Sequence, residues 1–112
     1  MILAPTRELA RQIEKDALLL GKFCGFKSAC IIGGVDYDKQ RNQIKAGADI
    51  LIATPGRLID FYKQRFFSLK QIEVLVVDEA DRMFDMGFIA DLRYLFRSCS
   101  PYNKRQTMLF SA

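Results

Sequence analysis

The sequence predicts an α/β domain in which helices flank both faces of a parallel sheet. Its strand candidates are short, uninterrupted apolar runs, which are typical of strands buried on both faces. Segments with apolar residues at helical spacing separate these runs, and no Asn-Gly or similar hairpin signal joins them. Half of the 112 residues are hydrophobic, so the chain can form a core and is not expected to be disordered.

The first predicted strand and helix occupy the start of the chain. Residues 1–4 form an apolar run that Pro5 ends, and Thr6 can cap the helix that follows. Apolar residues then recur at helical spacing until Gly21 or Gly25 ends that helix.

The second strand and helix follow the same order. Residues 28–32 are the next apolar run, which Gly33-Gly34 closes. Asp36 can cap a polar helix, and Gly47 is its expected C′ residue because glycine readily adopts the left-handed conformation found there.

The second half of the chain adds three strands. Residues 48–53 predict a strand with a continuous Ile-Leu-Ile centre, and a helix begins after it with Pro55, whose missing N–H costs nothing at the first helical position. Residues 74–77 predict the fourth strand, and a helix that carries Phe88, Ile89, Leu92, Leu95 and Phe96 comes next. A polar turn then precedes the fifth strand at 107–110.

Each unusual polar or glycine-rich cluster directly follows a predicted strand. The carboxyl ends of strands meet at one edge of an open parallel sheet, and ligands bind outside that edge. The sequence therefore predicts a single functional edge that carries Pro5-Thr6-Arg7, Gly33-Gly34, Thr54 to Arg57, Asp78 to Asp81, and Ser111-Ala112.

Two acids end the strand predicted at 74–77. Asp78 would emerge at the strand tip, where a carboxylate can hold Mg²⁺ through its water shell. Glu79 would stand beside it and could polarise an attacking water. The alternative is an acidic helix N-terminus that only complements the helix dipole.

The other clusters suit a sugar–phosphate chain. Two threonines each precede a helix whose first N–H groups can bind phosphate oxygens, and two arginines add bidentate donors. Two glycines allow close approach of a ligand, and none of these groups reads a base. The alternative for the third cluster is helix capping alone. The residues concerned are Thr6, Thr54, Arg7, Arg57, Gly34 and Gly56.

These clusters together resemble the motifs of the DEAD-box family of ATP-dependent RNA helicases, in the family's order. They are Pro5-Thr6-Arg7-Glu8-Leu9-Ala10, Gly33-Gly34, Thr54-Pro55-Gly56-Arg57, Asp78-Glu79-Ala80-Asp81 and the terminal Ser111-Ala112. Three further stretches, at 34–40, 57–61 and 81–88, resemble one bacterial branch of the family.

The resemblance implies part of a RecA-like domain of the P-loop NTPase class, with ATP and Mg²⁺ as cofactors. It implies that Asp78 reaches Mg²⁺–ATP, that Glu79 activates the hydrolytic water, and that Asp81 ties this motif to Ser111. It also implies an RNA-stimulated ATPase that unwinds RNA locally in bacterial RNA turnover or remodelling, with RNA-decay proteins as partners. RNA-backbone contacts are implied for Pro5, Thr6, Arg7, Gly34, Thr54, Gly56 and Arg57.

The phosphate-binding loop of this family is not in the sequence. No G-x-x-x-x-G-K-[ST] pattern occurs, because Gly21-Lys22 lacks both the upstream glycine and the following Ser or Thr. We therefore expect residues 1–112 to be part of the first RecA-like domain, inactive alone, from the first motif to the start of the Ser-Ala-Thr motif. The absent phosphate-loop strand is expected to leave a gap or an exposed apolar edge.

Two other interpretations are weighed against a helicase. A receiver-like binding module would need a further acidic pair after its first strand, where Pro5-Thr6-Arg7 supplies a cation. A helicase-derived module that binds RNA and hydrolyses nothing stays open for the chain itself.

Composition excludes several classes of site. The sequence has no histidine, so histidine metal sites and Ser-His-Asp catalysis are excluded. Its three cysteines form no CxxC pair and are expected to be free thiols in a reducing compartment. No apolar segment approaches the ~20 residues of a membrane span. A soluble, cytoplasmic protein is expected, and its net charge of +4 is compatible with a polyanionic partner.

Overall fold

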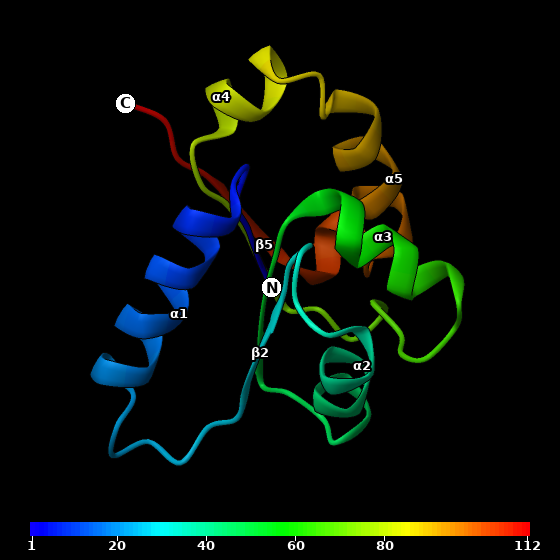
Figure 1. Cartoon of the computed structure of the whole chain (residues 1–112). Helices are drawn as coiled ribbons and strands as arrows, with labels where there is room; N and C mark the ends of the chain where they lie inside the picture. Colours follow the sequence, from blue (N-terminus) through cyan, green and yellow to red (C-terminus); the bar gives the residue numbers. More distant parts are fainter.

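The computed structural model describes all residues, 1–112, and places a five-stranded sheet between helices (Figure 1). All strand pairs are parallel, and the strand order is β2-β3-β1-β4-β5. The predicted fold class is therefore confirmed. The strands are β1 (Ile2–Leu3), β2 (Ser28–Ile31), β3 (Ile50–Ala53), β4 (Val74–Val77) and β5 (Gln106–Leu109).

Helices cover both faces of this sheet. Helix α1 packs over β2 and β3 on one face, whereas α2, α3 and α5 lie on the other (Figure 1). Helix α4 lies beyond the carboxyl ends of the strands. The helices are α1 (Arg7–Leu20), α2 (Tyr37–Lys45), α3 (Pro55–Lys63), α4 (Ala80–Asp85), α5 (Ile89–Ser98) and the 3-10 turn η1 (Tyr102–Lys104).

The predicted helix boundaries follow from local capping. The Thr6 hydroxyl accepts a hydrogen bond from the Leu9 N–H at 3.2 Å, and the Asp36 carboxylate accepts one from the Lys39 N–H at 2.7 Å. Each bond satisfies an amide that has no partner inside its own helix. Gly47 follows the C-cap of α2 with φ +86°, as expected of a C′ glycine.

Helix α4 is the element that the sequence analysis did not predict. It is only six residues long, and the left-handed Gly87 (φ +82°) separates it from α5. The Phe88 N–H donates to the Met83 carbonyl across this break at 2.9 Å (N···O). A six-residue segment contains too few apolar positions to give a recognisable helical period.

The main core lies between the sheet and the α2, α3 and α5 layer. Central strand β1 contributes Leu3, which is fully buried, and α3 contributes the fully buried Leu58 and Phe61. A smaller cluster under α1 contains Ala10 of that helix, Cys30 of β2, Ile52 of β3, and Ala4 and Ile32 from just after β1 and β2. These two clusters fix the strand ends, and with them the positions of the segments that follow.

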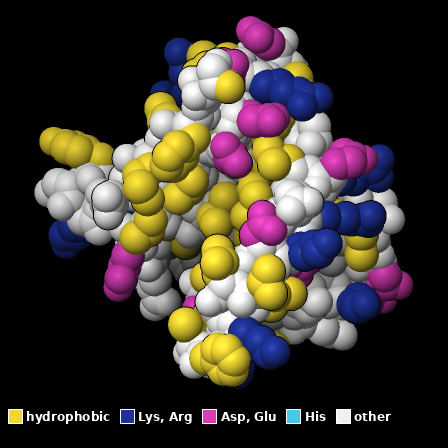
Figure 2. All heavy atoms as spheres, turned by 90° about the vertical axis from the view of Figure 1, so that its left-hand side faces the viewer, with side chains coloured by type: hydrophobic (Ala, Val, Ile, Leu, Met, Phe, Trp, Pro, Cys, Tyr) yellow, Lys and Arg dark blue, Asp and Glu magenta, His cyan; other side chains and the backbone are white.

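The α1 side of the molecule has many exposed hydrophobic side chains (Figure 2). Strand β5 forms one edge of the sheet, and Leu109 and Phe110 at its end are 56% and 53% exposed. The five strands pair without a gap. No helix has the length and apolar character needed to cross a membrane.

Candidate functional site

Backbone hydrogen bonds continue past the strands and align their carboxyl ends. The Thr54 N–H donates to the Ile31 carbonyl at 3.1 Å, and the Asp78 N–H donates to the Leu3 carbonyl at 3.0 Å. The segments after β1, β2, β3 and β4 therefore leave the sheet at the same edge. The polar and glycine clusters that follow these strands therefore share one edge, as predicted from the sequence, and the function of that edge stays a prediction.

A shallow pocket of about 510 Å³ lies at this edge between the starts of α1 and α3. We call it the cradle. It contains six of the seven residues predicted to contact a sugar–phosphate backbone, and the seventh, Gly34, adjoins it through Arg7. The cradle is lined by Pro5, Thr6, Arg7, Glu8, Gly33, Thr54, Gly56, Arg57, Asp60 and Phe88.

Two arginines supply the positive charge of the cradle. The structure contains two ion pairs, and neither involves Arg7 or Arg57. Their guanidinium donors are thus available to an anion. Glu8 and Asp60 also line the cradle and balance the two positive charges formally. The charged side chains that line the cradle therefore carry no formal net charge.

The two threonines of the cradle differ in whether their side chains cap the helix that follows. Thr6 caps α1 with its hydroxyl, as expected from its place before this helix. Thr54 makes no side-chain capping bond to α3, so its hydroxyl remains available. Because Pro55 has no N–H, the first amide donors of α3 are those of Gly56 and Arg57, both of which line the cradle.

Gly34 occupies a backbone position that other residues rarely adopt. Its φ is +74°, and a Cβ at this position would lie 2.4 Å from Nη1 of Arg7. Glycine therefore allows the left-handed turn and leaves space for the guanidinium. The two sequence clusters after β1 and β2 are in direct contact as a result.

The two acids lie after β4, the strand next to β1. Asp78 Oδ1 accepts a hydrogen bond from the Glu79 N–H at 2.9 Å, and both residues are partly buried. Glu79 has φ +48° and ψ +50°, a left-handed conformation that is costly for a residue with a side chain. Its carboxylate accepts a hydrogen bond from Arg82 Nη1 at 3.3 Å.

The end of β5 lies beside these acids. The Ala80 N–H donates to the Phe110 carbonyl at 2.8 Å, which joins the segment after β4 to the segment after β5. Asp81 and Ser111 are both exposed and share no hydrogen bond. Their coupling remains a prediction, and the backbone bond is the link that the structure provides.

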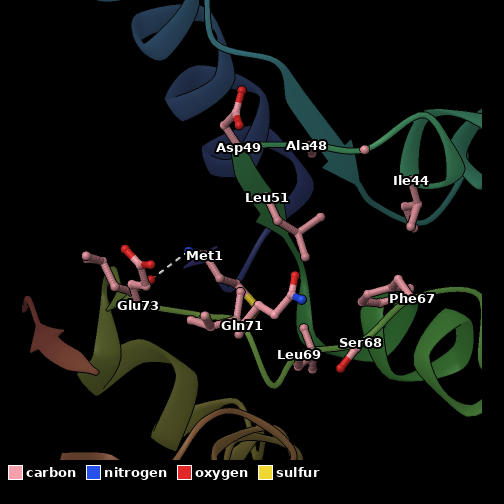
Figure 3. A pocket seen from close by; sticks show the side chains of 13 residues that line it. Met1, Ile44, Ala48, Asp49, Leu51, Phe67, Ser68, Leu69, Gln71 and Glu73 are labelled. Carbon is pink, nitrogen blue, oxygen red and sulfur yellow. Dashed lines mark hydrogen bonds between the residues drawn. The ribbon is translucent and has the colours of Figure 1, made fainter. Parts of the chain in front are cut away.

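A second hollow lies at the opposite, amino end of the strands (Figure 3). Its volume is about 530 Å³, and Ile44, Leu51 and Phe67 face it from three different segments. None of the residues predicted as functional lines this hollow. The predicted chemistry is thus confined to the carboxyl edge.

The sequence as a whole matches one family. The family model described as DEAD/DEAH box helicase covers residues 1–112. The chain belongs to this helicase family. The expectation drawn from the ordered motifs is confirmed.

Relatives within the helicase family support the bacterial branch suggested by the sequence. The chain is 58% identical to the "ATP-dependent RNA helicase RhlB" of Xanthomonas axonopodis pv. citri and to the RhlB proteins of Idiomarina loihiensis and Haemophilus influenzae. Each match covers the whole chain, but the chain spans only 20% to 27% of these relatives.

Solved helicase structures share the fold. A "hypothetical ATP-dependent RNA helicase" from Sulfolobus tokodaii superposes with a TM-score of 0.89 at 39% identity, and covers 99% of this chain and 33% of its own. The yeast DEAD-box splicing factor Prp28 superposes with a TM-score of 0.90 at 38% identity, over 99% of this chain and 27% of its own. The sheet and helices described above are therefore those of the helicase family.

Sequence reasoning missed several neighbours of the helicase motifs. Asp60 shares a helix face with Arg57 through its i+3 spacing, which could have been noticed. Phe88, which was predicted as part of a helix, is the residue before α5 and lines the cradle. Gln40, which is 1% exposed, donates from Nε2 to the Ile32 carbonyl at 2.8 Å and so holds α2 against the end of β2. No local signal marks this long side chain as buried.

Proposed function

We propose that the protein containing this chain is an ATP-dependent RNA helicase, and that residues 1–112 form part of its first RecA-like domain. The observation that carries this proposal is the common edge of the cradle and the Asp78–Glu79 pair. The cradle is lined mainly by the segments that follow β1 and β3. The two acids follow β4, which pairs directly with β1. A change in RNA position can thus reach the acids through one shared strand.

The nucleotide part of the proposal concerns the two acids. Bound Mg²⁺–ATP would supply a phosphoanhydride bond whose hydrolysis releases free energy for unwinding. The donor set fits such an ion, because Mg²⁺ keeps several waters and needs only one or two protein carboxylates. Asp78 would hold the hydrated ion, and Glu79 would accept a proton from the attacking water.

The RNA part of the proposal concerns the cradle. Arg7 and Arg57 would donate to phosphate oxygens, together with the amides at the start of α3. Pro5, Thr6, Gly34, Thr54 and Gly56 would border the backbone closely without reading bases, so binding would be largely independent of sequence.

The cellular setting belongs to the same proposal. We expect a cytoplasmic protein, because all three cysteines are free thiols and two of them are buried without a disulfide. RNA-decay proteins are the expected partners. This expectation comes from the resemblance to the bacterial branch of the family.

The test uses the full-length protein, expressed from its complete reading frame. Wild type should hydrolyse ATP faster with RNA and separate a short RNA duplex. Glu79→Gln should still bind ATP, whereas kcat should fall by about 10²–10⁴ because the amide cannot act as a base. Glu73→Gln, a carboxylate change at the other end of β4, should leave kcat unchanged. RNA binding without any hydrolysis in wild type would support the non-enzymatic alternative, and equal kcat in both variants would remove Glu79 from its role.

A further inference from the structure

The arginine of α3 is held by aromatic rings. We propose that Tyr37 is a positioning residue for RNA binding, whose ring holds the Arg57 guanidinium at the mouth of the cradle. The inference rests on the proposed function, because it needs Arg57 to contact an RNA phosphate.

The geometry brings three side chains together. Arg57 Cζ lies 5.5 Å from the centre of the Tyr37 ring and 5.9 Å from the centre of the Phe61 ring. Both distances are within the ~6 Å range in which a cation is attracted to an aromatic face. Tyr37 comes from α2, whereas Arg57 and Phe61 lie one turn apart on α3.

The aromatic support is itself fixed. The Tyr37 and Phe61 rings stack with their centres 4.3 Å apart and their planes 20° apart. Phe61 is fully buried in the main core, and the Tyr37 hydroxyl accepts a hydrogen bond from the Gln64 amide. A ring held on one side by the core and at its tip by an amide has little freedom to move.

An aromatic ring is better suited than a carboxylate to hold the Arg57 guanidinium ready for a phosphate. An acid paired with Arg57 would occupy the N–H donors that a phosphate needs, whereas an aromatic face attracts the guanidinium and leaves its edge donors free. Asp60 lines the same cradle, yet it forms no ion pair with Arg57. Holding the arginine before RNA arrives reduces the entropy lost on binding.

The position of Tyr37 also links two parts of the cradle. It is the first residue of α2 and follows Gly34 by three positions. Gly34 borders Arg7, so the loop after β2 reaches one cradle arginine and the start of α2 reaches the other. The same short segment therefore adjoins both arginines.

The test is a double-mutant cycle in the full-length protein, read as affinity for a single-stranded RNA of mixed sequence. Tyr37→Leu removes the ring and should weaken binding by about three- to tenfold, whereas Tyr37→Phe keeps the ring and should stay within about twofold of wild type. Arg57→Ala should weaken binding more. Tyr37→Leu should add no further loss when Arg57 is already alanine.

Phe66→Leu is the matched control for packing. Phe66 belongs to the same aromatic cluster, with its ring centre 6.2 Å from that of Phe61, and the cations over its ring are Arg41 and Lys45 instead of Arg57. The Phe66→Leu substitution should lower the melting temperature without weakening RNA binding. If Tyr37→Leu does not fold, Tyr37→Met replaces it, because methionine fills irregular space without a ring.

The outcomes separate this inference from the proposed function. Independent, additive losses from Tyr37→Leu and Arg57→Ala, or an unaffected Tyr37→Leu beside a weakened Arg57→Ala, would overturn the positioning role alone. An unchanged RNA affinity in Arg57→Ala would instead overturn the assignment of RNA to the cradle.

Discussion

At the scale of single residues, Gly34 leaves room for the guanidinium of Arg7. Its positive φ and the short distance between its would-be Cβ and Arg7 Nη1 are two separate constraints. Gly25 has a similar φ of +70°, but no atom lies within 4 Å of a Cβ placed there. The two glycines therefore allow backbone strain to be measured apart from displacement of the arginine.

Gly34→Ala is expected to weaken RNA binding by about tenfold in the full-length protein, because Arg7 must move and loses a charge-assisted hydrogen bond. Gly25→Ala should leave RNA affinity unchanged. Both changes should cost about 1 kcal/mol of stability from the left-handed backbone. Titration of labelled RNA and thermal unfolding measure the two effects, and equal RNA affinities in the two variants would contradict the role given to Gly34.

The three cysteines differ in their surroundings. Burial, with a nearby Glu14, raises the pKa of Cys30 to about 12, and burial also raises the pKa of Cys99. Cys24 is exposed after α1. Only the thiolate reacts with electrophiles, and a raised pKa keeps the thiol protonated at neutral pH.

At pH 8 a thiol-alkylating reagent is expected to modify Cys24 within minutes and to leave Cys30 and Cys99 largely unmodified in the native protein. After denaturation all three should react, because the desolvation that raised the pKa values is lost. Peptide mass mapping of the labelled full-length protein gives the extent of reaction at each site. Rapid native labelling of Cys30 would show that α1 does not cover β2 as described.

At the scale of elements, helix starts serve two different purposes. The Asp36 carboxylate is committed to capping α2, whereas the Thr54 hydroxyl makes no bond to α3. A cap contributes to stability, but an uncommitted hydroxyl at a cradle does not. Replacing Asp36 with alanine is therefore expected to lower the stability of the protein, whereas replacing Thr54 with alanine is expected to weaken RNA binding.

Asp36→Ala should lower the free energy of unfolding by about 0.5–2 kcal/mol, the usual cost of removing an N-cap. Thr54→Ala should lower it by less than about 0.5 kcal/mol, as for surface changes, yet should weaken RNA binding. Denaturant unfolding and RNA titration on the same two variants give the comparison. A destabilised Thr54→Ala with normal RNA affinity would favour a capping role for Thr54.

At the scale of the whole molecule, nucleotide chemistry needs parts that these 112 residues do not contain. Asp78 and Glu79 present negative charge, and the sequence has no glycine-rich loop with a lysine to offset a triphosphate. The exposed β5 edge, with Leu109 and Phe110, also leaves an apolar surface that favours association.

The 112-residue polypeptide alone is expected to show no ATP hydrolysis and no RNA unwinding. Contacts to the transferring phosphate, such as an arginine finger, raise the rate by about 10³–10⁵ in related systems. Weak nucleotide binding without such contacts would therefore not give turnover. The measurement is phosphate release from the purified polypeptide with and without RNA, beside its Glu79→Gln variant as background. RNA-stimulated release above that background would show that these residues suffice.

Much of the fold and of the site's chemistry was set by the sequence itself. Uninterrupted apolar runs gave parallel strands, because strands buried on both faces have no need of polar residues. Capping residues such as Thr6 and Asp36 placed helix starts, because a cap acts on amides only two or three positions away. The strand-end clusters were correctly expected to share one edge, because a parallel sheet gathers the ends of its strands.

Other features depended on contacts between distant segments, which only the tertiary structure decides. The strand order, the burial of Gln40 and the stack of Arg57 on Tyr37 all join residues from different elements. Helix α4 and the left-handed Glu79 form where the chain turns off β4 and bonds to the end of β5. Periodicity and propensity describe neighbours along the chain, whereas these features arise from packing energies that a local pattern does not contain.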